Sequence, residues 1–293
     1  MRGLSARLGL ALLLVLELAL FLRHARREIV PFYPTRHDQA TYLGEAYETR
    51  EAIRAEGLGR GLATGIARST PNGILLQAEG AFFSAFSGST RLAALGVNFL
   101  LFTLLQIVVF GTLLRRANDT LAAFAGVGLL LTAGTPFFWA GGLFDFRLDF
   151  AAFCLFGVFV SLVVRSGFFE SPGFSFAAGL VGALLVMHRF IAVVFVAGIL
   201  GLFAILTVFS RGEARRFRGA LIAGLGLLLA APALLANASA IRSYYVVNHV
   251  LGGDKAIRAA QQGITSLGRS LLFYPRSAAF HHAGPAFLLV SAL

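Results

Sequence analysis

The sequence predicts an all-α, multi-pass helical membrane protein. Of its 293 residues, 57% are hydrophobic and only 13% are charged, against about 25% charged in an average soluble domain. The hydrophobic residues gather in long runs of the length that crosses a bilayer. Arginines concentrate on alternate connections between these runs, as in membrane proteins that cross the bilayer repeatedly. This composition excludes a disordered chain, an ordinary water-soluble enzyme and a nucleic-acid-binding tail, so we expect no nucleic acid partner.

The first predicted span covers Leu8–Leu22 and follows a short N-terminus that carries Arg2 and Arg7. A cleaved signal peptide is the alternative. The run contains Glu17, lacks a cleavage site with small residues and is followed by further spans. We therefore interpret it as an uncleaved anchor.

A long polar outer loop with interfacial helices is predicted over residues 23–90. Ala40–Glu56 carries Glu and Arg at helical spacing and predicts a helix. A glycine-rich joint is expected over Gly57–Gly65, and the sequence at Pro71–Gly73 breaks the chain again. Ile74–Phe86 is apolar but too short to span, so we expect a helix that lies in the membrane interface.

Six further spans follow, which makes about seven, and a partial eighth starts near Pro285. The final apolar run, 286–293, is too short to cross a bilayer. We therefore expect residues 1–293 to form a single transmembrane domain that is truncated at its C-terminus. The six spans are Arg91–Leu114, Leu121–Trp139, Phe150–Val164, Phe174–Met187, Ile191–Phe209 and Ala220–Ala236.

Basic residues predict the orientation. A cytoplasmic N-terminus places nine arginines on the short inner segments and only two, Arg147 and Arg189, on the short outer turns. The basic residues other than histidine are 24 Arg and the single Lys255, a bias that fits a GC-rich bacterial genome. We expect a bacterial plasma (inner) membrane protein with a cytoplasmic N-terminus. The nine inner arginines are Arg2, Arg7, Arg115, Arg116, Arg165, Arg211, Arg215, Arg216 and Arg218.

The first candidate site is the segment Arg36-His37-Asp38 just outside the first span. Asp38 can act as a general base on an acceptor hydroxyl or amine. Arg36 and His37 can hold a phosphate. The alternative is a charged loop in solvent.

The second candidate is the turn that contains Asp145, Arg147 and Asp149. The i, i+4 spacing of the two aspartates predicts that they stack on one helix face. Such a pair can orient a sugar hydroxyl or bind a divalent cation, which is the only cofactor the sequence suggests. The alternative is a helix cap with an arginine that reaches toward lipid headgroups.

The third candidate is the outer turn His188-Arg189, where an arginine suits a lipid phosphate. The alternative is an ordinary basic turn. Tyr244 is a further substrate-binding candidate, although tyrosine pairs such as Tyr244-Tyr245 often belong to the interfacial belt. His281-His282 offers possible metal ligands without partners at zinc spacing.

Weak motifs follow one another in an order that resembles a known family. An acidic motif follows the first span, then come a proline-containing break and an apolar helix, then Phe86-Ser87-Gly88-Ser89-Thr90-Arg91-Leu92 at the entry to the next span. Thr135-Pro136-Phe137-Phe138 precedes the second acidic turn. This order resembles the GT-C superfamily of membrane glycosyltransferases, in particular bacterial relatives of protein O-mannosyltransferases and lipid A aminoarabinose transferases.

The resemblance implies a polyprenyl-phosphate sugar donor and a lipid, glycan or protein acceptor at the outer membrane face. It implies that Asp38 is the catalytic base and that Asp149, with Asp145 as its rival, is a second acidic site residue. Arg189 and His188 would lie near the donor phosphate. Relatives often carry an acidic pair where this chain has Asp38-Gln39, and they are usually longer.

Two other functions fit a helical membrane protein. A transporter or flippase for a lipid-linked or anionic solute would use Arg147 and Arg189 along its path. Transporters usually carry ionisable groups near the bilayer centre and show internal repeats, whereas here the charges gather at one outer rim without a repeat. A non-catalytic scaffold would leave Asp38 in bulk water, away from Asp149.

Overall fold

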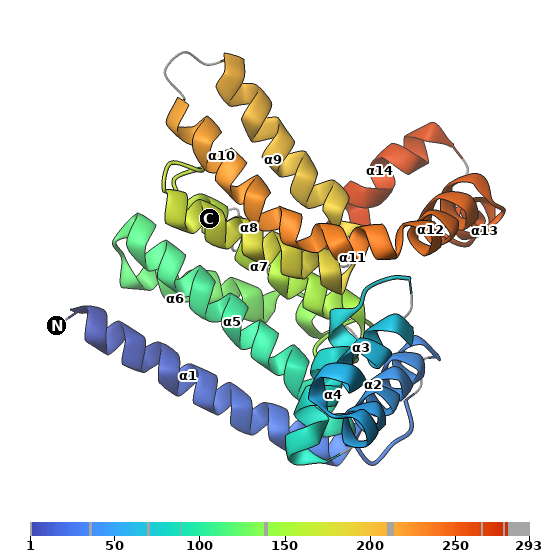
Figure 1. Ribbon diagram of the computed structural model, residues 1–293. Helices are drawn as coiled ribbons and strands as arrows, with labels where there is room; N and C mark the ends of the chain where they lie inside the picture. Colours follow the sequence, from blue (N-terminus) through green and yellow to red (C-terminus); the bar gives the residue numbers. More distant parts are fainter. Residues whose placement is uncertain are drawn as a thin grey trace.

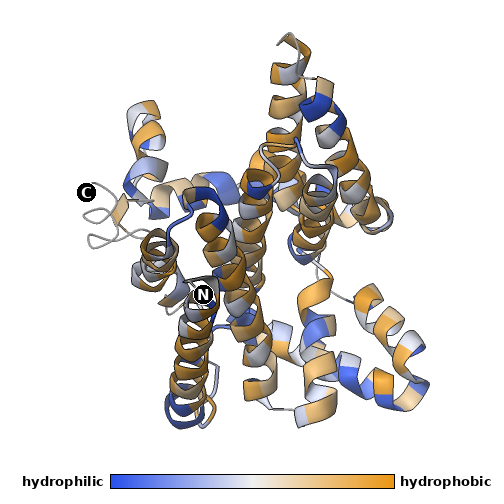
Figure 2. Cartoon of the chain, turned by 90° about the vertical axis from the view of Figure 1, so that its left-hand side faces the viewer, coloured by the Kyte–Doolittle hydropathy of each residue, from blue (hydrophilic) through white to orange (hydrophobic). Residues whose placement is uncertain are grey.

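The computed structural model describes residues 2–34, 37–68, 71–88, 90–137, 140–209, 214–264, 266–277 and 279–280. Within these ranges every regular element is helical, which confirms the all-α prediction. Figure 1 shows a bundle of long helices with a cluster of shorter helices at one end. Figure 2 shows that hydrophobic residues cover most of the length of the bundle helices, as in a protein embedded in a membrane.

Five helical segments in the described part of the chain are long and apolar enough to cross a membrane. The first is α1 (Arg2–His24), which continues into a π-helical segment, Ala25–Ile29; the others are α5 (Arg91–Ala117), α7 (Leu148–Arg165), α9 (Ala192–Phe209) and α10 (Ala214–Leu227) with its continuation to Ala236.

Two of the seven predicted spans form shorter apolar helices, α6 (Thr120–Thr132) and α8 (Pro172–His188). The span predicted over Leu121–Trp139 ends early because the backbone becomes extended at Ala133, and a single 3₁₀ turn, Thr135–Phe137, follows. Trp139 and the expected eighth span near Pro285 lie outside the described residues. The count of seven is therefore reached only if α6 and α8 also cross.

The polar region folds into α2 (His37–Glu56), α3 (Leu58–Arg68) and α4 (Leu75–Ser87). The expected glycine-rich joint over Gly57–Gly65 is wrong, because most of it is helix α3 and only Gly57, at φ +84°, makes the turn. Gly61 and Gly65 instead allow close packing. A Cβ on Gly65 would lie 2.3 Å from the Thr49 side chain of α2.

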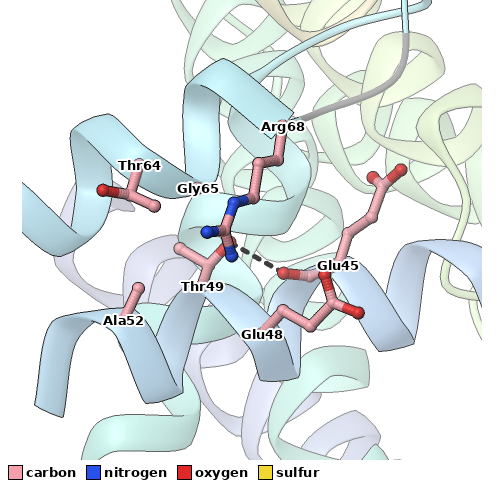
Figure 3. A pocket seen from close by; sticks show the side chains of 7 residues that line it. All are labelled: Glu45, Glu48, Thr49, Ala52, Thr64, Gly65 and Arg68. Atoms are coloured by element: carbon pink, nitrogen blue, oxygen red, sulfur yellow. Dashed lines mark hydrogen bonds between the residues drawn. The ribbon is translucent and has the colours of Figure 1, made fainter. Parts of the chain in front are cut away.

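Figure 3 shows the small cavity that remains between α2 and α3, with Thr49 and Gly65 on its two walls. Its volume is about 10 Å³, which is space for one water molecule at most. The Thr49 hydroxyl donates to the carbonyl of Glu45 within its own helix at 2.7 Å. We conclude that this hairpin is a closely packed structural unit.

The bundle packs in the order α5, α7, α8, α10, each against the next. Small residues allow the closest approach: a Cβ on Gly179 of α8 would lie 2.1 Å from the carbonyl oxygen of Ala223 on α10, as is usual between membrane helices. On the other side, Gln106 of α5 donates to the Glu17 carboxylate of α1 at 2.7 Å. This bond attaches the first helix to the bundle.

After α10 the chain continues through α11 (Ala231–Ala236), α12 (Ala238–Ile241), a π-helical segment (Arg242–Leu251), α13 (Asp254–Gln261) and α14 (Leu267–Ser277). We call "turn end" the end of the bundle at which α5, α7 and α9 finish and α6, α8 and α10 begin. We call "loop end" the opposite end, which carries α2–α4 and residues 140–147 and 189–191 (Figure 1). The predicted inner and outer segments therefore gather at different ends, while the side that faces the cytoplasm remains a prediction.

Candidate functional site

The loop before α7 is fixed by a buried asparagine. Asn98 of α5 donates to the carbonyl oxygens of Leu143 and Asp145 at 3.1 and 3.0 Å. The Asp145 carboxylate in turn accepts the backbone N–H of Gly141 at 2.7 Å, where Gly141 turns at φ +79°. These bonds hold the loop at the loop end of the bundle in one conformation.

The two aspartates of this segment do not stack on one helix face, which corrects the prediction. Helix α7 begins only at Leu148, and Arg147 before it has extended backbone angles, φ −134° and ψ 156°. Asp145 therefore lies in the loop and Asp149 in the first helical turn. Each of them pairs with a different arginine.

Arg147 connects the loop to the beginning of α2. Its Nη1 lies 3.1 Å from Asp38 Oδ2, and its Nε lies 2.8 Å from Asp145 Oδ2. The Asp38 side chain is 60% exposed, whereas that of Asp145 is only 4% exposed. Burial raises the pKa of Asp145, opposed by the Gly141 N–H and by Arg147. Of the two aspartates paired with Arg147, Asp38 is thus the one that a substrate can reach.

A second ion pair joins Arg189 to Asp149, with Nη2 and Oδ1 3.1 Å apart. The turn that carries Arg189 is bound by its backbone to the break before α4. Phe190 N–H donates to the Asn72 carbonyl at 2.9 Å, and Ile74 N–H donates to the Met187 carbonyl at 2.8 Å.

The residue between these two bonds has to be glycine. A Cβ on Gly73 would lie 1.9 Å from the carbonyl oxygen of His188. The segment Pro71–Gly73, predicted from the sequence as a simple break, is therefore a supporting element of the Arg189 turn.

Tyr42 lies one helical turn after Asp38, within electrostatic range of residues from both ion pairs. Its side chain is buried, and burial raises its pKa to about 12, opposed by a side-chain hydrogen bond with Asn72 and by the charge of Arg189. The negative charges of Asp149 and Asp38 act on the same hydroxyl. The charges of Asp38, Asp149 and Arg189 therefore all influence this one tyrosine.

A second tyrosine reaches this group from the C-terminal part of the chain. The Tyr245 hydroxyl donates to Asn72 Oδ1 at 3.3 Å, and burial raises its pKa as well. The predicted residue Tyr244 instead packs its ring against Tyr245 and His249, with centroid distances of 4.9 and 4.5 Å. Sequence reasoning missed Tyr42, Asn72 and Tyr245, because only the fold brings these distant segments together.

His188 is buried, with 1% of its side chain exposed. Its Nε2 lies 3.0 Å from Glu79 Oε2 of α4, and its Nδ1 lies 3.0 Å from the Leu184 carbonyl oxygen. Both ring nitrogens are therefore occupied by protein groups. His188 joins α8 to α4 beside the site, and Glu79 is a partner that the sequence did not indicate.

Arg91 and Gln39 support the first turn of α2. Arg91 donates to Gln39 Oε1 at 2.7 Å and to the carbonyls of Ile29 and Phe32 at 3.0 and 3.1 Å. Gln39 Nε2 donates to the Phe144 carbonyl at 3.3 Å. Gln39, the residue that follows Asp38, thus fixes α2 against the loop before α7.

The other predicted residues contribute less to this geometry. His37 is exposed at the start of α2, where its carbonyl accepts the Thr41 hydroxyl at 3.1 Å. Arg36 and His281-His282 lie outside the described residues. Within the described ranges no group of three His, Cys, Asp or Glu side chains could hold a metal ion. Because the aspartates are also paired with arginines, this donor set does not fit a divalent cation.

Comparison of the chain with protein-family models, with curated proteins and with solved structures finds no match.

Proposed function

We propose that the protein is a membrane glycosyltransferase of the bacterial plasma membrane. It transfers a sugar from a polyprenyl-phosphate donor to a lipid, glycan or protein acceptor at the outer membrane face. The observation that carries this proposal is that two arginine–aspartate pairs, Arg147–Asp38 and Arg189–Asp149, lie next to each other at the loop end, since Arg147 and Asp149 are two residues apart. Catalytic groups must converge on one reacting centre, and these groups come from three separate segments of the chain.

Asp38 is assigned the role of general base. Its carboxylate is exposed and held in place by Arg147. As the acceptor hydroxyl attacks the anomeric carbon, its proton passes to Asp38. The new oxygen–carbon bond forms while the bond from that carbon to the phosphate oxygen breaks, and polyprenyl phosphate leaves as the anion.

Arg189 is assigned to the phosphate of the donor. A guanidinium carries five N–H donors, and the ion pair with Asp149 engages Nη2. The remaining donors can bind phosphate oxygens and stabilise the charge that develops on the leaving group. Asp149 keeps the guanidinium in place beside the reacting centre.

Tyr42 is a neutral hydrogen-bonding group in this proposal, because a pKa of about 12 keeps its proton in place at physiological pH. Asp145 is too buried to meet a substrate and positions Arg147. Activated donors of this type arrive within the membrane, so the reaction needs no nucleotide at the site.

The test uses the full chain reconstituted in liposomes with radiolabelled polyprenyl-phosphate hexoses and pentoses. Release of free sugar to water is measured, so that the acceptor need not be known. Asp38→Asn is expected to slow release by about 100-fold or more, since loss of a general base costs roughly 10²–10⁴-fold. Binding of the donor should change little.

Glu51→Gln is the matched control, because Glu51 is an exposed carboxylate on the same helix that pairs with Arg50 and Arg54. It should leave the rate unchanged. Full activity of Asp38→Asn, or no release from any donor by the wild type, would overturn the proposal. Movement of intact donor between leaflets without cleavage would favour the transporter instead.

A further inference from the structure

A basic cleft lies at the turn end of the bundle, far along the helices from the candidate active site. Its volume is about 460 Å³, within the range of small-ligand sites. Four arginines from three helices line it, together with one carboxylate and the beginning of α8. The charged lining residues are Arg115, Arg116, Arg165, Arg215 and Glu170.

The positive charge of this cleft is not neutralised by the protein. Glu170 is engaged by Arg216, whose Nε and Nη2 lie 3.1 and 2.6 Å from Oε1. Among the described residues, none of the four lining arginines forms an ion pair with a carboxylate. Like charges gathered in one cavity repel one another, so an anion in the cleft would stabilise this end of the bundle.

Neutral groups hold three of these arginines in position. The guanidinium carbons of Arg115 and Arg165 lie 5.4 and 4.7 Å from the centre of the Phe174 ring, within the range of a cation–π contact. Arg116 donates to the carbonyl of Val164. The Nε of Arg165 is buried and has no hydrogen-bond partner. The charges are thus oriented in advance, and N–H donors remain for a ligand.

The start of α8 adds a second favourable feature for an anion. This helix has 17 residues and begins at Pro172, with Ser171 as its N-cap, and both residues line the cleft. The Ser171 side chain makes no capping hydrogen bond, so the first amides of α8 are not satisfied by it. The N-terminus of a helix attracts anions through these amides and through its dipole.

We propose that this cleft binds a phosphate group, carried by the headgroup of an anionic phospholipid in the leaflet at the turn end. Guanidinium forks match phosphate oxygens, and basic pockets between membrane helices bind such headgroups. Exposed apolar side chains beside the cleft, Phe168 and Phe176, offer a surface for acyl chains. This site is independent of the glycosyltransferase activity proposed above.

The experiment compares lipids retained by the purified full chain. The protein is reconstituted in equal amounts of phosphatidylglycerol and phosphatidylcholine and re-extracted, and the lipids that stay bound are measured by mass spectrometry. The wild type should enrich phosphatidylglycerol. The double variant Arg116→Gln/Arg215→Gln should bind it about tenfold more weakly, because two charge-assisted bonds to phosphate are lost.

The matched control is Arg7→Gln/Arg218→Gln, which removes two exposed arginines from the same end without touching the cleft lining. It should behave as the wild type. If the double cleft variant fails to fold, the single variant Arg215→Gln is tested instead, because replacement of this exposed side chain should not disturb folding. About threefold weaker retention of phosphatidylglycerol is then expected.

A second arm distinguishes a lipid from a soluble ligand. Inorganic phosphate is added to the protein in neutral detergent, with chloride at equal ionic strength as reference, and the melting temperature is measured. A rise that depends on Arg116 and Arg215 without enrichment of phosphatidylglycerol supports the phosphate site and identifies a soluble source. Equal behaviour of the cleft variants and the control variant in both arms overturns the proposal.

Discussion

The arginines of the candidate site at the loop end and those that line the basic cleft at the turn end have different partners. At the loop end, Arg147 and Arg189 each lie within 3.1 Å of an aspartate. At the turn end, Arg115, Arg116 and Arg165 lie against a ring face or a carbonyl and have no carboxylate partner among the described residues. The candidate site and the basic cleft are thus rich in the same side chain, and the partners of their arginines differ.

This difference separates two uses of a guanidinium. An arginine paired with an aspartate has one preferred position, which serves a reaction that needs fixed geometry. An arginine without a counter-charge presents uncompensated charge, which serves the capture of an anion. The contrast predicts that variants at the loop end change catalysis and folding, and that variants at the turn end change binding.

The largest effect is expected from Gly73→Ala at the loop end. A Cβ at 1.9 Å from the His188 carbonyl oxygen cannot be accommodated unless the Pro71–Gly73 segment moves away from α8. Both backbone bonds that hold the Arg189 turn would then break. We expect a loss of about 2–3 kcal/mol in the free energy of unfolding, measured as a large fall in melting temperature in detergent.

Gly44→Ala on α2 is the control for this change. Nothing lies within 4 Å of the Cβ that it would add, and alanine favours a helix over glycine by about 0.5–1 kcal/mol. It should therefore leave the protein as stable or slightly more stable. A Gly73→Ala variant with wild-type melting temperature and activity would contradict the described contact between the two turns.

An intermediate effect is expected from a double-mutant cycle on the Asp149–Arg189 pair. If Asp149 acts mainly by fixing Arg189, Asp149→Asn and Arg189→Gln should each slow sugar release, and the double variant should be little slower than the worse single one. The coupling should amount to about 1–3 kcal/mol. Additive losses would show that the two side chains work separately and would remove the positioning role of Asp149.

Most of the fold could be predicted because membrane helices are long hydrophobic runs. The predicted spans find counterparts in α1 and α5–α10, and the polar helix expected over Ala40–Glu56 is α2. The prediction failed at glycines, because glycine occurs both in turns and at places where two helices pack closely. Gly57–Gly65 is typical of a joint, yet Gly61 and Gly65 serve helix–helix contact, a use that only a three-dimensional partner such as Thr49 reveals.

The candidate site was only partly predictable. Asp38, Asp149 and Arg189 stand out because charges at the rim of a membrane are costly and few. The partners Tyr42 and Asn72 carry no such signal, because a tyrosine in an interfacial helix and an asparagine in a turn are common. His188 and Asp145 have the expected residue types, but burial makes them supports for the site. The depth of a side chain is decided by packing between distant segments.

The smallest effect, and the clearest in sign, is expected from Glu170→Gln at the turn end. Glu170 is the one carboxylate among the described residues that line the basic cleft. Its removal leaves more positive charge there, so retention of phosphatidylglycerol should strengthen by about two- to threefold, as expected for a partly exposed charge.

The lipid-retention measurement described above reports this change directly. Weaker retention would mean that Glu170 acts mainly by holding Arg216 in place. The idea that unpaired arginines at the turn end capture an anion would then be wrong. Removal of a loop-end aspartate, in contrast, should lower the rate of sugar release and leave lipid retention unchanged.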